Sequence, residues 1–86
     1  MRPVNRQRKA GMLGVGFDAQ DGQTRITKGD NFLLYGGSQE THEVMQETAT
    51  KINEELDYRS QRLEDVSPRE LRGIARDVLQ QVIGKK

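Results

Sequence analysis

The first half of the chain shows the period-two alternation of apolar and polar residues that is typical of β-strands. The alternation is clearest at Leu13, Val15 and Phe17, which fall on one side of a half-buried strand and are separated by glycines that permit close backbone approach. A stretch rich in β-branched residues follows, and then a short run that is apolar on both faces. We predict strands over about residues 12–18, 24–28 and 32–35.

Turn-forming residues separate these predicted strands. Asp21-Gly22 is a strong turn signal, because glycine readily adopts a positive φ, and residues 29–31 form the next turn cluster. Short connections favour pairing between consecutive strands. We therefore expect a three-stranded antiparallel meander (β-β-β).

Helical spacing of apolar residues begins after Ser38, which is a good N-cap. This spacing predicts a first helix over about residues 39–60, with one apolar arc and carboxylates on the opposite side. A second helix over about residues 68–83 has a capping box, because Ser67 is followed three residues later by Glu70. Since the linker is short, we expect an α+β domain in which a two-helix hairpin packs on one face of the sheet.

Composition bounds the domain organisation and the cellular setting. The chain has 86 residues, a net charge of +1 and no cysteine. This length allows one domain, which we place at residues 11–86, and the lack of cysteine excludes disulfides, thiolate nucleophiles and iron–sulfur ligation. A small chain without disulfides is typical of a reducing compartment, and no apolar run is long enough for a transmembrane helix. We expect a cytoplasmic protein that does not bind membranes.

Residues 1–10 are basic and carry few apolar side chains. Such a segment buries too little surface to offset the entropy lost on ordering, so we predict a flexible basic N-terminal arm. The arm is either a solubilising tail or a contact arm for an acidic or phosphate-bearing surface.

Residues suited to enzyme chemistry are scarce. A catalytic role for His42, the only histidine, would need Ser38 or a carboxylate such as Glu43 as its partner; the alternative is a hydrogen-bonded histidine beside the apolar arc. The turn aspartates, Asp18 and Asp21 among them, lack the ligand spacing of an EF-hand loop. We predict a protein that is not an enzyme and that holds no cofactor and no metal.

The strand-to-helix junction at Gly36, Gly37 and Ser38 is a candidate weak anion site. Backbone N–H groups at the start of a helix attract negative charge, and glycine lets a ligand approach closely. Ordinary helix capping is the alternative interpretation, because the junction lacks the phosphate-loop pattern and its lysine.

Five arginines form a candidate contact surface for nucleic acid or another anionic partner. Arg69, Arg72 and Arg76 recur at helical spacing, and Arg59 and Arg62 precede them. Arginine suits phosphate, because its guanidinium forms bidentate hydrogen bonds. The alternative is that these arginines pair with carboxylates of the first helix, and stacking on bases is limited in a chain with two Phe, two Tyr and no Trp.

The apolar stripe of the second helix is wider than a sheet of this size can cover. Leu79 and Ile83 are therefore candidate interface residues for a second copy or another protein, and the alternative is that they belong to the core of the domain. We hypothesise a non-catalytic protein-interaction domain whose partner is another protein or a second copy of the chain. The alternative hypothesis is an accessory nucleic-acid-binding protein that uses the arginine stripe and the basic arm.

Overall fold

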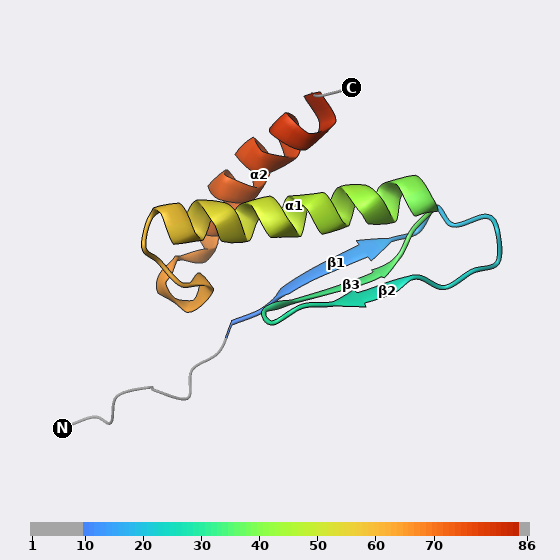
Figure 1. Ribbon diagram of the computed structural model, residues 1–86, viewed down its shortest axis with the longest axis horizontal. Helices are drawn as coiled ribbons and strands as arrows, with labels where there is room; N and C mark the ends of the chain where they lie inside the picture. Colours follow the sequence, from blue (N-terminus) through green and yellow to red (C-terminus); the bar gives the residue numbers. More distant parts are fainter. Residues whose placement is uncertain (1–9, 85–86) are drawn as a thin grey trace.

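The fold combines a small sheet with two helices, as the α+β prediction states (Figure 1). The computed structural model describes residues 10–84, so residues 1–9 of the predicted basic arm lie outside the described range. The elements are β1 (Met12–Gly16), β2 (Ile26–Lys28), β3 (Phe32–Gly36), α1 (Gln39–Tyr58), a 3-10 turn η1 (Leu63–Asp65) and α2 (Pro68–Gly84).

The sheet is mixed, and the prediction of an antiparallel meander is wrong for β1. The strand order is β1-β3-β2: β3 lies in the centre, antiparallel to β2 and parallel to β1. The short turn between β2 and β3 permits the predicted hairpin. The segment between β1 and β2, residues 17–25, is instead long enough to carry the chain past the end of the sheet, which leaves room for β3 between the two outer strands.

Glycines determine which side of β1 faces the helix. A Cβ built on Gly14 would lie 2.9 Å from Leu34 Cδ2 and 3.1 Å from Met45 Sδ, so this side of the strand is in close contact with α1. A Cβ on Gly16 would lie 2.6 Å from the Cα of Gly37. The alternation along β1 therefore buries its glycine side, and Leu13 and Val15 point away from α1.

The two helices pack against each other, but only α1 lies along the sheet. Helix α1 contacts β1 and β3, whereas α2 packs on α1 and leads away from the strands (Figure 1). The prediction that the helical hairpin packs on one face of the sheet therefore holds for α1 and is wrong for α2, because the apolar side of α2 packs on α1. The main core forms between the helices and η1, and its buried members are Ile52, Leu56, Leu63, Ile74, Val78 and Val82.

Local capping explains where the helices begin and end. Ser38 Oγ accepts a hydrogen bond from the Thr41 N–H at 3.1 Å, which confirms the predicted N-cap of α1. The predicted capping box of α2 is also present, because the Glu70 N–H donates to Ser67 Oγ and the Ser67 N–H donates to Glu70 Oε1. Helix α1 ends at Tyr58, since Ser60 adopts a φ of 56° in the left-handed region.

Candidate functional site

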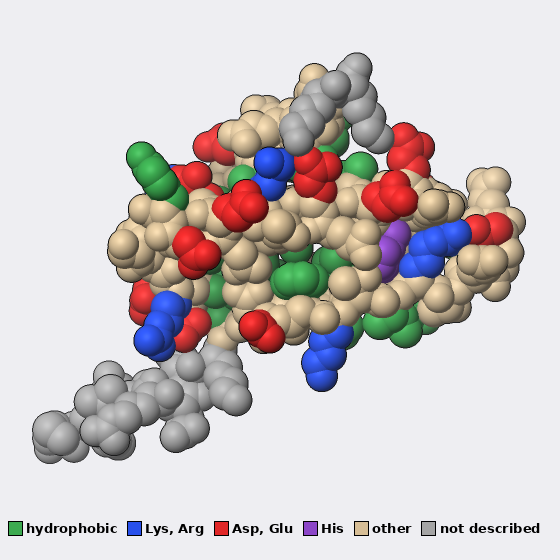
Figure 2. Space-filling view, in the orientation of Figure 1, with side chains coloured by type: hydrophobic (Ala, Val, Ile, Leu, Met, Phe, Trp, Pro, Cys, Tyr) green, Lys and Arg blue, Asp and Glu red, His purple; other side chains and the backbone are tan. Residues whose placement is uncertain are grey.

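An apolar surface covers the side of the sheet that faces away from α1. The register aligns Leu13 with Leu33 and Val15 with Tyr35, and Ile26 pairs with Tyr35 from the other side. All five side chains are exposed, and we call this surface the open sheet face. Figure 2 shows apolar side chains emerging below the strands, on the side opposite to α1.

The open sheet face is large for a chain with 33% hydrophobic residues. Its five members are between 41% and 70% exposed. At about 150–200 Å² for each fully exposed residue, they present roughly 500 Å² of apolar surface. A patch of this size lies at the upper end of what monomeric proteins expose and is commonly functional. Lys28, aligned with Leu33, is the one charged side chain among the paired strand positions of this face.

Phe17 extends the apolar series beyond the end of β1. It directly follows the strand and is 92% exposed. Burial of an aromatic side chain yields a large hydrophobic gain, and aromatic residues are enriched at protein interfaces. Phe17 therefore adds a prominent apolar group beside the open sheet face.

The predicted anion site at Gly36, Gly37 and Ser38 already contacts a carboxylate of the protein. The Ser38 N–H donates to Asp18 Oδ1 at 2.8 Å, and the hydroxyls of Ser38 and Thr41 donate to Asp18 Oδ2 at 3.1 and 2.6 Å. These hydrogen bonds, that from Thr41 first, hold the pKa of Asp18 below its ordinary value. The internal carboxylate thus supplies the negative charge that the start of α1 favours.

Asp21 and Arg25 organise the same loop. Arg25 Nη2 donates to Asp21 Oδ2 at 2.5 Å, and Arg25 Nη1 donates to the carbonyl of Gly37 at 3.1 Å. The hydrogen bond from Arg25 is the largest cause that lowers the pKa of Asp21 to about 2. The turn aspartates therefore bind groups of the protein itself. Within residues 10–84, no group of three or more metal-ligating side chains comes together.

His42 is a buried member of a hydrogen-bond chain between α1 and the sheet. Its Nδ1 lies 2.9 Å from the carbonyl of Gly36, which can only accept, so Nδ1 carries a proton. Its Nε2 lies 2.8 Å from Thr27 Oγ1, and Gln46 Nε2 donates to that same hydroxyl at 2.9 Å. The Thr27 hydroxyl thus connects the His42 ring to the Gln46 side chain. Both ring nitrogens of His42 are thereby engaged in structural contacts, as the hydrogen-bonded alternative predicts.

The five candidate arginines separate into two groups. Arg59 Nε donates to Glu55 Oε2 at 2.8 Å, and Arg62 lies 3.9 Å from Glu64. Arg69, Arg72 and Arg76 are exposed on α2, and no ion pair to another described residue holds them. Only the three arginines of α2 thus remain as an unpaired cationic stripe within the described range. Figure 2 shows acidic side chains spread along α1.

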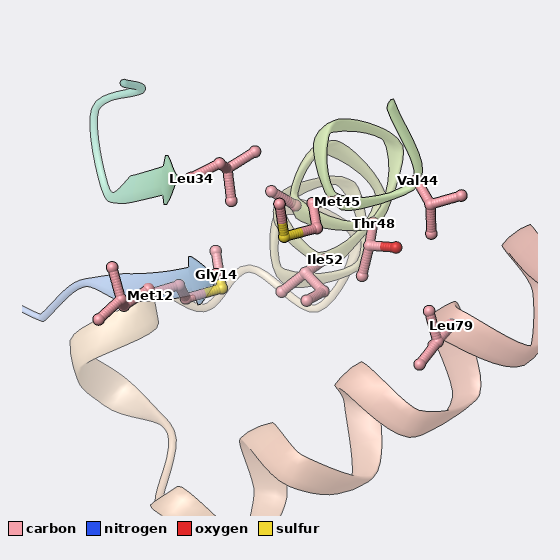
Figure 3. A pocket seen from close by; sticks show the side chains of 10 residues that line it. Met12, Gly14, Leu34, Val44, Met45, Thr48, Ile52 and Leu79 are labelled. Atoms are coloured by element: carbon pink, nitrogen blue, oxygen red, sulfur yellow. The ribbon is translucent and has the colours of Figure 1, made fainter. Parts of the chain in front are cut away.

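The predicted interface residues Leu79 and Ile83 have different surroundings. Leu79 lines an apolar groove of about 250 Å³ between β1, α1 and α2, together with Met12, Gly14 and Met45 among others. Figure 3 shows Leu79 on α2 across the opening from Val44 and Thr48 of α1. Ile83 is 53% exposed and does not line this groove.

Helices within residues 10–84 are too short or too polar to cross a membrane. Comparison of the chain with protein-family models, with curated proteins and with solved structures gave no match. The candidate site therefore rests on the chemistry of the described surface.

The sequence interpretation did not single out the open sheet face as a site. Two signals for it exist in the printed sequence. The run Phe32-Leu33-Leu34-Tyr35 is apolar on both faces, and Gly14 and Gly16 occupy the side of β1 opposite to Leu13. A central strand that is apolar on both faces is typical of a sheet covered on both sides.

Proposed function

We propose that this protein is a non-catalytic protein-interaction domain that binds an apolar protein surface through the open sheet face. One observation carries the proposal: each of the three strands has apolar side chains that point away from α1 and are exposed, namely Leu13, Val15, Ile26, Leu33 and Tyr35. Removing apolar surface from water provides about 25 cal/mol per Å². A partner that covers the open sheet face would gain this free energy, which the isolated domain leaves unused.

The shape and chemistry of the face support a protein as the partner. Its apolar side chains stand on a sheet, and Lys28 supplies a single positive charge. Nucleic acid binding depends on several cations that contact phosphates, and small ligands are bound in concave pockets. A flat apolar surface with an aromatic side chain, here Tyr35, matches the core of a protein–protein interface instead.

A capture experiment with matched variants tests this function. Leu33→Glu places a charge on the open sheet face, and Ile83→Glu places the same charge on α2, at a residue of comparable exposure, 53% against 41%. Tagged wild-type protein and both variants serve as baits in an extract of the source cells. Retained proteins are identified by mass spectrometry, purified and tested again for direct binding.

We expect at least one protein to bind wild type and Ile83→Glu directly and to lose binding to Leu33→Glu. A buried glutamate without a partner would remain uncompensated at the interface. If all three baits bind the same proteins equally well, the open sheet face is not the binding surface, and the proposal is wrong.

A second candidate function, binding of nucleic acid, is favoured by the exposed arginines of α2. We propose that Arg69, Arg72 and Arg76 would contact phosphates in that case. Fluorescence anisotropy with labelled RNA and duplex DNA at about 50 mM salt tests it. Replacing the three arginines by Gln should lower the salt slope of log K by about 2–3. Absence of binding by the wild-type protein at low salt would exclude this function.

A further inference from the structure

We infer that the protein surface bound by the open sheet face is that of a second copy of this chain. Two sheets would then pack face to face, with α1 and α2 of each copy on the outside. This arrangement has four layers, helix, sheet, sheet and helix. The inference rests on the proposed function and specifies its partner.

The area of the face matches what a dimer needs. The five residues present roughly 500 Å² on each copy, and Phe17, at 92% exposure, adds about 200 Å². Two copies would bury about 1,200–1,400 Å² in total. Specific and stable interfaces begin at about 1,200 Å². Together with Phe17, the open sheet face therefore reaches the size of a small stable interface when it meets a copy of itself.

The face is also compatible with a copy of itself in charge. Its aligned rows are Leu13–Leu33–Lys28 and Val15–Tyr35–Ile26. A two-fold axis along β3 places Lys28 opposite Leu13 of the other copy, and an axis across the strands, between the rows, places it opposite Ile26. In neither case do two lysines meet. Lys28 lies on an outer strand, so its ammonium group can reach water past the apolar neighbour.

The remaining residues of this sequence complement the face poorly. Among residues 1–9, Arg2, Arg6, Arg8 and Lys9 are cationic, and residues 85–86 are both lysines. Burying such charges against an apolar sheet would be unfavourable, because each would lose hydration without a counter-charge. A second copy brings five apolar side chains to the same surface.

Sedimentation equilibrium of the purified full chain, from micromolar to near-millimolar concentration, tests the inference. We expect the mass to rise from one chain to two with increasing concentration. Leu33→Glu should raise the dissociation constant at least about a hundredfold, because each dimer would bury two unpaired carboxylates. Ile83→Glu should leave the dissociation constant within about twofold of wild type. Far-UV circular dichroism checks that each variant retains its helices.

A cross-linking experiment locates the interface directly. The natural chain has no cysteine, so Leu33→Cys introduces a single thiol. Facing sheets lie about 10 Å apart, within reach of a short bismaleimide that links two thiols. We expect Leu33→Cys to form covalent dimers at high yield and Ile83→Cys to remain monomeric under the same conditions.

Each result separates the inference from the proposed function. A wild-type chain that stays monomeric at every concentration overturns the second copy as partner; the proposed function then stands if another protein binds in a Leu33-dependent way. A dimer that is insensitive to Leu33→Glu, or that cross-links through Ile83→Cys instead, also overturns the inference. If neither a second copy nor any other protein binds in a way that depends on Leu33, both the inference and the proposed function are wrong.

Discussion

The Gly16→Ala substitution tests the close approach between the end of β1 and the junction that leads from β3 into α1. An added Cβ would lie 2.6 Å from the Cα of Gly37 and 3.0 Å from its nitrogen. Ordinary contacts between carbon atoms are about 3.5–4.0 Å, so the two backbones would have to separate by about 1 Å. Gly37 has little freedom to move, because it lies in a tight junction with a φ of 85° and its own carbonyl accepts a hydrogen bond from Arg25.

The magnitude follows from the kind of atom that is met. Overpacking a well-packed site costs about 1–3 kcal/mol, and the upper part of that range applies because backbone rather than a flexible side chain lies in the way. The reduced entropy of the unfolded alanine chain offsets less than about 1 kcal/mol. We expect a net loss of about 1.5–2.5 kcal/mol. For a domain of this size, that loss corresponds to a fall in Tm of about 6–20 °C.

Thermal unfolding followed by circular dichroism measures the effect, with wild type and variants at one fixed protein concentration. Gly73→Ala is the matched control: it is the same substitution inside α2, and an added Cβ there meets no atom within 4 Å. Alanine stabilises a helix interior by about 0.5–1 kcal/mol relative to glycine, so this Tm should rise by a few degrees. If Gly16→Ala unfolds within about 2 °C of wild type, the close crossing of the two backbones is refuted.

Other substitutions test the two faces of the sheet and its polar contacts to α1. Leu34→Ala, on a side chain that is 3% exposed, should cost about 2–5 kcal/mol in chemical denaturation, whereas Leu33→Ala, one position along, should cost under about 1 kcal/mol at low protein concentration; equal costs would contradict the assignment of the faces. Thr27→Val should cost about 1–3 kcal/mol because it removes the hydrogen-bond partner of His42 Nε2, and Thr27→Ser should keep most of the wild-type stability; a Thr27→Val variant as stable as wild type would show that the hydroxyl contributes nothing. The pKa values of Asp18 and Asp21 are lowered by folding, so their contribution to stability is present above their ordinary pKa values and is lost as the pH falls through the lowered ones, which for Asp21 is about 2. Asp21→Asn should therefore reduce the loss of Tm between pH 4 and pH 2, and an unchanged pH profile would argue against the pairing with Arg25.

Features determined by neighbouring residues were predictable from the sequence. Ser38 and Ser67 cap their helices through bonds to residues three positions away, and the periodicity that follows each serine is local. The β2–β3 hairpin is predictable for the same reason, because residues 29–31 bring its strands together. The candidate arginines are correctly placed on or before α2, but their pairing with carboxylates depends on side-chain positions that spacing does not supply.

The order of the strands could not be obtained in this way. Asp18 has the sequence context of a turn residue, yet its carboxylate binds Ser38 and Thr41, which lie 20 and 23 positions further along the chain. This contact connects the loop after β1 to the start of α1. It accompanies the parallel pairing of β1 with β3, and neither is visible in a local pattern.

The sequence by itself determined the composition of elements: three strands, two capped helices and a strand, β3, that is apolar on both faces. Tertiary structure decided which side of β1 is covered. Leu13 and Val15 alternate with Gly14 and Gly16, and by hydrophobicity alone the larger side chains would face the helix. Met45 packs against the glycine side instead, because glycine has no Cβ and so lets α1 approach the sheet closely. The apolar side chains of β1 are thereby turned outward, and this orientation creates the surface through which we propose that the protein binds its partner.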